Sequence, residues 1–316
     1  MTRLLVTGAS GLLGLNLSLL AVEQGYQVLG WVNANLLTHT PFLIQQIDLC
    51  NLSQIRERIS VIKPDVIVHC AALAHIDLAE ARPEWAMRIN AEAAGEIARV
   101  AAEDSIPMIH ISTDAVFDGQ KGNYVESEVP SPISIYAKSK LAGEEAVNTA
   151  NPDAIIARVN FYGWSISGQR SLGEFFFYNL QAGHPVKGFT DVVFCPLYVG
   201  QLAQILLEMV KKQLHGLYHV LSSEHLSKYD FGCAIARKFD FDESLITPIS
   251  VQEAGLSAAR SPNLTMQVEK LEHDLGHSLP NQARGLDAFY EAYQAGLPAR
   301  IKSFLYHTFP TKHAYA

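Results

Sequence analysis

The sequence predicts an α/β fold in which a doubly wound parallel sheet is accompanied by a smaller C-terminal lobe. Short apolar segments alternate with segments of helical periodicity over residues 3–161, and a glycine-rich turn joins the first apolar segment to the first helix. Strands that alternate with helices form βαβ units, which build a parallel sheet covered by helices on both faces. After about residue 165 the alternation becomes irregular, which indicates the second lobe.

Each segment of this alternation has its own signals. The segments expected to form strands are short and mostly aliphatic, as in buried parallel sheets. They are residues 3–7, 26–32, 43–49, 65–72, 107–113, 153–161 and 216–222. The segments expected to form helices have apolar residues at helical spacing, and Gly25, Pro64 and Ser227 mark two ends and one start. They are residues 15–25, 53–63, 84–104, 136–147, 171–183, 197–213 and 227–239.

The predicted organisation is two lobes and a tail. Residues 1–165 are expected to form the sheet domain, to which the strand at 216–222 returns. Residues 166–300 are expected to supply most of the second lobe. Residues 301–316 are aromatic and irregular, and we expect them to pack on a partner or to be disordered.

The composition excludes several classes of protein. The chain has 316 residues and a net charge of −8, so it lacks the basic character that nucleic-acid binders usually have. No apolar run approaches the roughly 18 residues of a membrane-spanning helix. The N-terminus leads straight into a strand rather than a signal peptide, so we expect a cytoplasmic protein. Four distant cysteines and 12 scattered histidines predict neither a disulfide framework nor a metal site.

The glycine-rich turn reads TGASGLLG at residues 7–14. Gly8 would allow a tight turn, Gly11 a close approach of backbone to a pyrophosphate, and Gly14 close packing of helix against strand. The phosphates would lie at a helix N-terminus, where free N–H groups favour negative charge. This context predicts a Rossmann-type dinucleotide site rather than a glycine-rich turn without a ligand. The expected cofactor contacts here are Gly8, Ser10, Gly11, Leu12, Leu13 and Gly14.

Further cofactor contacts are expected where other strands end. The second strand ends in GWVNAN, which places Trp31 or Asn33 at the adenosine ribose. This segment has neither the acidic residue that is typical of NAD sites nor a basic residue that could bind the 2′-phosphate of NADP. Arg3 is the nearest basic residue before it in the sequence. The sequence therefore leaves both NADP and NAD open as the cofactor. Asp48 and Leu49 are expected near the adenine. Four residues at the end of the fourth strand could line the cofactor, because small residues there leave room for it, although the alanines could equally serve helix–sheet packing. These are Cys70, Ala71, Ala72 and Leu73.

Tyr136 and Lys140 stand four residues apart in SIYAKSK, so on a helix they would lie on one face. By itself this spacing also fits an ordinary solvated helix. The order of the surrounding motifs favours a reactive pair, because the glycine loop and the strand-end STD precede it and LAGE follows it.

The motifs TGASGLLG, VHCAA, INA, ISTDAVFDG, YAKSKLAGE and RSPNLTM occur in the order found in extended short-chain dehydrogenases/reductases. Within that family the chain most resembles the dTDP-4-dehydrorhamnose reductases. The resemblance rests on STDAVFDG followed by Y-x-x-S-K-x-x-G-E, and on Asp77, Glu80 and Asn90. It covers about residues 3–300 and implies that Asn90 belongs to the cofactor site.

The resemblance implies that NADPH or NADH reduces the C4 ketone of a nucleotide-linked deoxysugar. Tyr136 would be the general acid and a cofactor contact, and Lys140 would lower the pKa of Tyr136 and bond the nicotinamide ribose. Thr113 would hydrogen-bond the ketone oxygen or, alternatively, cap its own backbone. Asp114 would contact the substrate or serve as a turn residue. We expect a nucleotide-sugar substrate and leave a homodimer open.

Several features keep other activities open. Ala115 and Ala137 stand where the family usually has an aromatic residue and a glycine, near the expected sugar pocket. The stretch GLYHVLSSEHLSKYDFGCAIA also resembles the β regulatory subunit of methionine adenosyltransferase, a non-enzymatic relative that binds a nicotinamide cofactor. An epimerase would use the same triad without net oxidation of the cofactor. A 4,6-dehydratase is disfavoured, because such enzymes place Asp-Glu after the threonine, whereas Ala115 follows Asp114 here.

Overall fold

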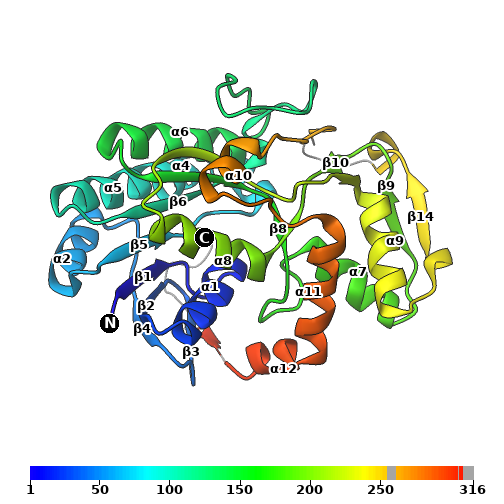
Figure 1. Ribbon diagram of the computed structural model, residues 1–316, viewed down its shortest axis with the longest axis horizontal. Helices are drawn as coiled ribbons and strands as arrows, with labels where there is room; N and C mark the ends of the chain where they lie inside the picture. Colours follow the sequence, from blue (N-terminus) through cyan, green and yellow to red (C-terminus); the bar gives the residue numbers. More distant parts are fainter. Residues whose placement is uncertain (255–260, 305, 309–316) are drawn as a thin grey trace.

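The computed structural model of the chain describes residues 1–254, 261–304 and 306–308. Its centre is a parallel sheet of seven strands (Figure 1). In spatial order the strands are β12 (Gly216–Val220), β7 (Ile155–Val159), β6 (Met108–Thr113), β5 (Val66–His69), β1 (Arg3–Thr7), β2 (Gln27–Val32) and β4 (Leu43–Gln46). The predicted doubly wound α/β fold is confirmed, and so is the return of the late strand β12 to the sheet beside β7.

Helices cover both faces of the sheet and enclose two separate hydrophobic cores (Figure 1). One layer contains α1 (Leu12–Glu23) and α8 (Val199–Lys211), and the other contains α2 (Leu52–Ile62), α5 (Ala93–Glu103) and α6 (Ile135–Ala150). Side chains of β1 alternate between the cores, because successive residues of a strand point to opposite faces. Leu4 and Val6 join the α1 and α8 side, whereas Leu5 joins the α2 and α5 side.

Several predicted boundaries were wrong. The strand expected at 43–49 is only β4, and β3 (Asn35–Leu37) was not predicted. The helix expected at 84–104 is interrupted: α4 (Pro83–Met87) passes into a π-helical turn, η1 (Arg88–Glu92), before α5 begins. Propensity does not reveal a π-helical turn, since it depends on tertiary contacts that accommodate one extra residue per turn.

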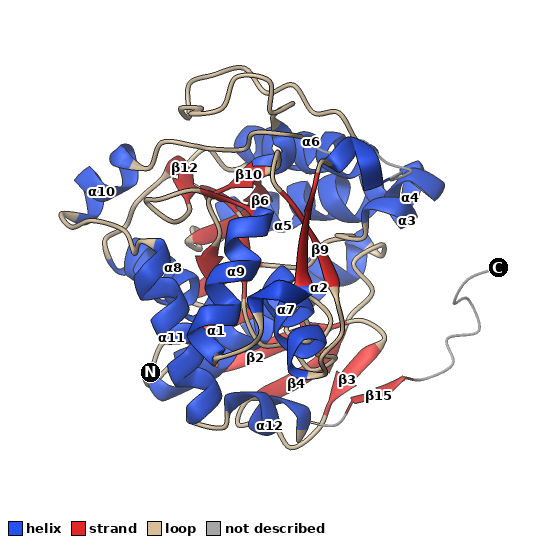
Figure 2. Cartoon of the chain, turned by 90° about the vertical axis from the view of Figure 1, so that its right-hand side faces the viewer, coloured by secondary structure: helices blue, strands red, loops and turns tan. Residues whose placement is uncertain are grey.

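The second lobe is assembled from segments far apart in the sequence (Figure 2). Its main helices and paired strands are α7 (Leu172–Gln181), α9 (Lys228–Phe239), α11 (Gln282–Gln294), β9 (Val186–Phe189) and β14 (Ile246–Ile249). Its core is aromatic: the rings of Trp164 and Phe289 stack with their centroids 4.0 Å apart, and Phe177 meets Trp164 edge-on. The division at residue 165 stays a prediction, and α8 packs on α1 of the sheet domain.

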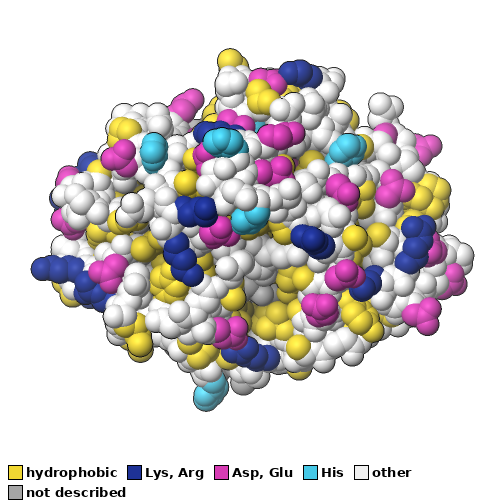
Figure 3. Space-filling model, in the orientation of Figure 1, with side chains coloured by type: hydrophobic (Ala, Val, Ile, Leu, Met, Phe, Trp, Pro, Cys, Tyr) yellow, Lys and Arg dark blue, Asp and Glu magenta, His cyan; other side chains and the backbone are white. Residues whose placement is uncertain are grey.

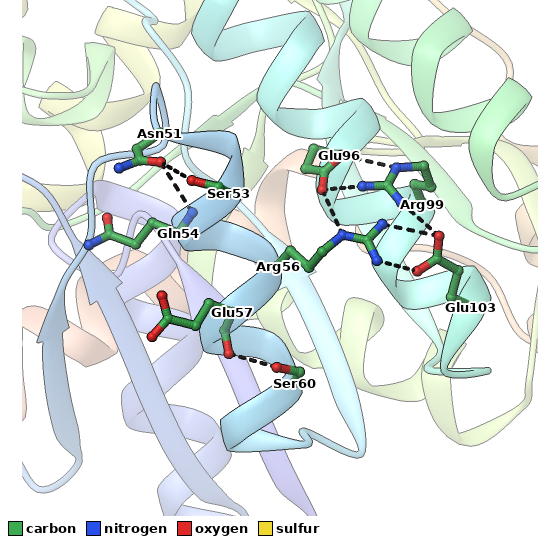
Figure 4. Close-up of polar contacts among 9 residues, drawn as sticks. All are labelled: Asn51, Ser53, Gln54, Arg56, Glu57, Ser60, Glu96, Arg99 and Glu103. Atoms are coloured by element: carbon green, nitrogen blue, oxygen red, sulfur yellow. Dashed lines mark hydrogen bonds and ion pairs between the residues drawn. The ribbon is translucent and has the colours of Figure 1, made fainter.

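An exposed ion-pair network joins α2 to α5 on the outside of the sheet domain (Figure 4). Arg56 donates hydrogen bonds to both carboxylate oxygens of Glu103, at 2.9 and 3.1 Å, and lies 3.5 Å from Glu96. Arg99 pairs with the same two carboxylates. We call these four residues the α2–α5 network.

The expected tail lies mostly outside the described residues. Within it, β15 (Tyr306–Thr308) pairs antiparallel with β3, so this short segment is a strand rather than irregular chain. Arg260 of the RSPNLTM motif also lies outside the described residues. Within the described part of the chain, no helix is both long enough and apolar enough to span a membrane.

Candidate active site

The glycine loop connects β1 to α1 as predicted. Gly8 has φ +66°, and a Cβ placed there would lie 2.8 Å from the backbone of Ala71. A Cβ at Gly14 would lie 2.2 Å from the carbonyl oxygen of Gly8, so only glycine lets α1 approach this turn. Gly11 precedes α1 without a side-chain cap, and the first turn of α1 carries no acidic residue. The loop therefore fits a dinucleotide phosphate, because the first-turn N–H groups remain available.

A cleft opens at the carboxyl ends of β1, β2, β4 and β5. Nine residues predicted as cofactor contacts line it: Gly8, Ser10, Gly11, Trp31, Asp48, Leu49, Cys70, Ala71 and Ala72. The other predicted cofactor contacts do not line it: Leu12, Leu13, Gly14, Leu73, Asn90, Tyr136 and Lys140. Leu12 and Leu13 instead bury their side chains in the core, because α1 is surrounded by other elements on nearly all sides.

The region of the adenosine ribose differs from the expectation. Trp31 lines the cleft, but its side chain is buried and its indole N–H donates to Gln45. Asn33 and Asn35 line the same wall. Arg3 lies at the opposite end of β1 and pairs with Asp65, 3.3 Å away, so it is excluded as a ligand for a cofactor phosphate.

Asn90 does not line the cleft, but it holds the backbone of Leu73, which follows the cleft-lining residues 70–72. Its side chain accepts from the N–H of Leu73 at 2.8 Å and donates to the carbonyl of Leu73 at 3.2 Å. It also donates to Ser139 of α6 at 2.9 Å. A Cβ at Gly143 would lie 2.2 Å from the carbonyl oxygen of Asn90, so Gly143 allows α6 to pack against the π-helical turn. Asn90 thus ties the loop after β5 to the helix that carries Tyr136 and Lys140.

Thr113 and Asp114 end β6 at the same edge of the sheet. The Thr113 hydroxyl accepts from the N–H of Ala115 at 3.2 Å and donates to Asp114 at 3.1 Å, so the alternative backbone-capping role is present. Asp114 is buried, and Asn160 donates to its second oxygen at 2.6 Å. Burial raises the pKa of Asp114 to about 6, although the hydrogen bonds from Asn160 and Thr113 oppose the rise.

Tyr136 lies in the first turn of α6, after the N-cap Ser134. It is partly buried, and its ring packs against a small cluster that includes Leu73. Burial raises the pKa of Tyr136 to about 12; a hydrogen bond with Thr113 opposes the rise and the Asp114 carboxylate adds to it. The prediction that Lys140 lowers this pKa was wrong, because Lys140 does not act on the phenol in this arrangement.

Lys140 is buried one helical turn after Tyr136 and reaches toward the sheet. Its ammonium donates to the carbonyl of Ile111 at 2.6 Å and lies 3.5 Å from Nε2 of His110. Burial lowers the pKa of Lys140 to about 8, while Glu144 and Cys70 oppose the shift.

Two buried histidines behind Lys140 were not predicted. His69 and His110 stack with their centroids 5.4 Å apart, and Nδ1 of His69 lies 2.7 Å from the Thr7 hydroxyl. Burial lowers the pKa of His69 to about 3 and that of His110 well below its usual value, with Lys140 acting in the same direction, so both rings are neutral. Within the described chain, no group of three or more His, Cys, Asp or Glu side chains is placed to hold a metal ion.

Comparison with known proteins identifies the family. Residues 1–295 match the profile described as the RmlD substrate binding domain. A protein of Haloferax volcanii named a probable low-salt glycan biosynthesis reductase is 35% identical over 292 residues, covering 91% of this chain and 97% of that protein. Methionine adenosyltransferase 2 subunit beta of Danio rerio is 32% identical over 288 residues, covering 85% and 84%.

A solved structure agrees with these matches. The dTDP-4-dehydrorhamnose reductase of Bacillus anthracis, determined in complex with NADP, superposes with a TM-score of 0.79 at 27% identity, covering 92% of this chain and 99% of that one. The resemblance drawn from the motifs is confirmed. The chain therefore belongs to the RmlD substrate-binding family, a family of NAD(P)-dependent sugar-nucleotide reductases within the extended short-chain dehydrogenases/reductases.

Proposed function

We propose that the protein uses NADPH or NADH to reduce the C4 ketone of a nucleotide-linked deoxysugar, in the manner of a dTDP-4-dehydrorhamnose reductase. The observation that carries the proposal is the convergence of Thr113, Asp114 and Tyr136 at the sheet edge where the glycine loop lies. Carboxyl ends of parallel strands meet at one edge, which is where α/β proteins bind ligands. The bound cofactor would supply the hydride for the ketone carbon.

Tyr136 would give its hydroxyl proton to the ketone oxygen as that oxygen becomes an alkoxide. The high pKa of Tyr136, about 12, keeps the phenol protonated at neutral pH, and an alkoxide is still more basic than a phenolate. The Thr113 hydroxyl would donate to the same oxygen and stabilise its developing charge. Asp114, held by Asn160, would accept from a sugar hydroxyl.

Lys140 would hold the cofactor rather than act on the phenol directly. Because the pKa of Lys140 is about 8, the amine is protonated in most molecules at neutral pH. Ribose hydroxyls are suitable hydrogen-bond acceptors for this ammonium. Asn90 would keep the loop from Cys70 to Leu73 against the catalytic helix and so act as a positioning residue.

The direct test is a reductase assay. Purified protein is mixed with dTDP-4-dehydrorhamnose and NADPH or NADH, and the absorbance of the reduced cofactor is followed together with the sugar product. Tyr136→Phe should lower the turnover number by roughly 100- to 10,000-fold, because the general acid is lost. Tyr26→Phe is the control, since Tyr26 lies at the far end of β2 and should keep the wild-type rate. Cofactor oxidation that does not exceed that of Tyr136→Phe would refute the proposal for this substrate.

A second candidate is a non-catalytic, cofactor-binding regulatory subunit. It is favoured by the 32% identity to a protein named methionine adenosyltransferase 2 subunit beta. The test is to mix the protein with a methionine adenosyltransferase catalytic subunit and measure co-purification and adenosyltransferase kinetics. A stable complex with altered kinetics, combined with no reductase activity, would support this candidate.

The epimerase alternative has a distinct readout. An epimerase would convert a sugar nucleotide without net oxidation of the cofactor. The reductase proposal expects one oxidised cofactor for each ketone reduced, so the ratio of product to oxidised cofactor separates the two activities.

A further inference from the structure

Arg170 brings a positive charge from the second lobe to the cofactor cleft. It lies between β8 (Phe161–Tyr162) and α7, yet it lines the cleft formed by the ends of the sheet strands. Among the described residues that line this cleft, Arg170 is the sole lysine or arginine. Arg170 was not predicted as a site residue, because about 160 residues separate it from the glycine loop.

The position of Arg170 points to the adenosine end of the cleft. Arg170 also lines a small adjoining cavity together with Ser10 of the glycine loop and Asn35 of β3. The end of β2 contributes Val32 and Asn33 to the same wall. In Rossmann-type sites the end of the second strand faces the adenosine ribose: an acidic residue there binds the 2′-hydroxyl of NAD, and an arginine nearby accepts the 2′-phosphate of NADP. Asn33 cannot repel a phosphate as a carboxylate would.

The loop that carries Arg170 is held in place by a buried carboxylate. Glu174 accepts hydrogen bonds from the N–H of Arg170 at 2.9 Å and from the N–H of Ser165 at 2.6 Å. The other end of the loop is fixed to α1, because Asn16 donates to the carbonyl of Trp164 at 3.0 Å. Glu174 therefore binds the backbone of the loop and not the Arg170 guanidinium.

The guanidinium itself is available for a ligand. Arg170 is exposed, and no described residue forms an ion pair or hydrogen bond with its side chain. A guanidinium has five N–H donors in a fork that matches phosphate oxygens in pairs. An unpaired arginine on a fixed loop, beside Ser10 and Asn35, suits a dianionic phosphate better than a neutral ribose hydroxyl.

We propose that Arg170 binds the 2′-phosphate of NADP(H), assisted by Ser10, Asn33 and Asn35, so that the second lobe selects NADP(H) over NAD(H). This assignment rests on the nicotinamide dinucleotide of the proposed function but not on the sugar substrate. It predicts that the wild-type protein binds NADPH more tightly than NADH.

The test measures equilibrium binding of NADPH and NADH by calorimetry with wild-type protein and Arg170→Ala. A charge-assisted, bidentate contact corresponds to a change in affinity of roughly 10- to 100-fold. Arg170→Ala should therefore lower the affinity for NADPH by that factor. The affinity for NADH should stay within about threefold of wild type, which is the scatter expected for a surface substitution. Arg170→Lys should fall between, because lysine keeps the charge but lacks the fork. Lys187→Ala is the control, since it removes an exposed positive charge of the same lobe on β9.

A second variant tests the same subsite from the sheet domain. Asn33→Asp places a carboxylate at the end of β2. It should lower the affinity for NADPH by more than tenfold and leave the affinity for NADH unchanged or higher. Adenosine 2′,5′-bisphosphate and AMP serve as fragments, and only the bisphosphate should lose affinity in Arg170→Ala.

Three results would overturn the assignment. Equal weakening of both cofactors in Arg170→Ala would place the arginine on the diphosphate, and unchanged binding of both would remove it from the site. A wild-type preference for NADH would also refute it. If the wild-type protein bound neither cofactor, the proposed function would fail as well, whereas NADPH-selective binding without reductase activity would leave this assignment standing.

Discussion

Two groups of charged residues lie on the α2, α5 and α6 side of the sheet, but in different surroundings. The α2–α5 network lies at the surface, where the side chains of Arg56 and Glu103 are 45% and 47% exposed (Figure 4). The pair of Arg158 on β7 and Glu144 on α6 is buried, at 2% and 7% exposed. The Arg56 guanidinium makes two contacts with its carboxylate, at 2.9 and 3.1 Å, and the Arg158 guanidinium makes three, at 2.7–3.3 Å. What differs is access to water.

The buried pair lies beside the candidate catalytic groups. Glu144 follows Lys140 by one helical turn, and it accepts a hydrogen bond from Ser112, the residue before Thr113. Most charged side chains, by contrast, lie at the surface, as Figure 3 shows for one face of the molecule. Removing water strengthens electrostatic interactions and increases the cost of unpaired charge. Similar contacts therefore carry unequal free energy, and the pKa shifts caused mainly by desolvation near the site, those of Asp114 and Lys140, belong to the buried region.

The largest effect is expected from breaking the buried pair. Glu144→Gln leaves Arg158 as a buried charge without its carboxylate, which should lower the free energy of unfolding by roughly 3–5 kcal/mol. Denaturant unfolding measures this change. Glu103→Gln in the α2–α5 network is the matched control and should cost less than about 1 kcal/mol. Similar losses in both variants would contradict the comparison.

Removing the Thr113 hydroxyl tests the site itself. Thr113→Val should lower the turnover number by roughly 100- to 1,000-fold, because a donor to the developing oxyanion is lost. Initial rates at saturating cofactor measure the effect. Thr247→Val is the control, because Thr247 is exposed on β14. A variant that retained more than a third of the wild-type turnover would show that Thr113 serves only as the backbone cap.

The Asp114 carboxyl should make stability depend on pH. Its folded pKa of about 6 exceeds the usual 3.8, so its stabilising contribution is complete below about pH 4 and is lost as the pH rises through 6. Asp114→Asn should therefore gain stability relative to wild type between pH 4 and 7, by roughly 3 kcal/mol. Urea unfolding at several pH values measures the difference.

Asp118 provides a control of opposite sign. Backbone and side-chain hydrogen bonds hold the pKa of Asp118 below its usual value, so its contribution is lost as the pH falls rather than as it rises. Asp118→Asn should therefore be less stable than wild type near neutral pH, and this difference in the free energy of unfolding should disappear at low pH. A pH-independent difference for Asp114→Asn would contradict the raised pKa.

Lys140 should set the alkaline limb of activity. Its pKa of about 8 means that the ammonium is lost as the pH rises through 8, so kcat/KM should fall about tenfold per pH unit above that value. Measurements from pH 6 to 10 with saturating cofactor test this limb. Activity that stayed constant to pH 9.5 would show that the ammonium is not required or that its pKa is higher.

The smallest effect is expected at the surface. Arg56→Ala should change the free energy of unfolding by less than about 1 kcal/mol, and salt near 1 M should reduce the difference further by screening. Thermal unfolding at low and high salt measures both effects. A loss above about 2 kcal/mol would show that the α2–α5 network is stronger than its exposure implies.

The sequence predicted the parts of the site that are local. The strand, turn and helix of residues 3–25 carry their own signals, because Gly8 allows the positive φ of the turn and Gly14 relieves a contact with the Gly8 carbonyl within that segment. The four-residue spacing of Tyr136 and Lys140 is also a local signal, and both residues lie on α6 as it predicts. The return of β12 to the sheet was also visible, as a late apolar segment.

The parts that sequence reasoning missed depend on contacts between distant segments. Asn160 reaches Asp114 only because β6 and β7 are neighbours, and His110 reaches Lys140 only because α6 packs over β6. The predicted effect of Lys140 on the pKa of Tyr136 failed because helical spacing does not fix where a long side chain points.

The sequence by itself determined the parallel α/β architecture, the glycine-rich turn between β1 and α1, and the order of the candidate catalytic residues, since periodicity and turn geometry act over a few neighbouring residues. The tertiary structure decided which charges are buried, which histidines lie behind Lys140, and that Arg170 of the second lobe lines the cleft beside Ser10 and Asn35. Burial and long-range proximity are properties of the packed chain, because desolvation depends on every segment that surrounds a group.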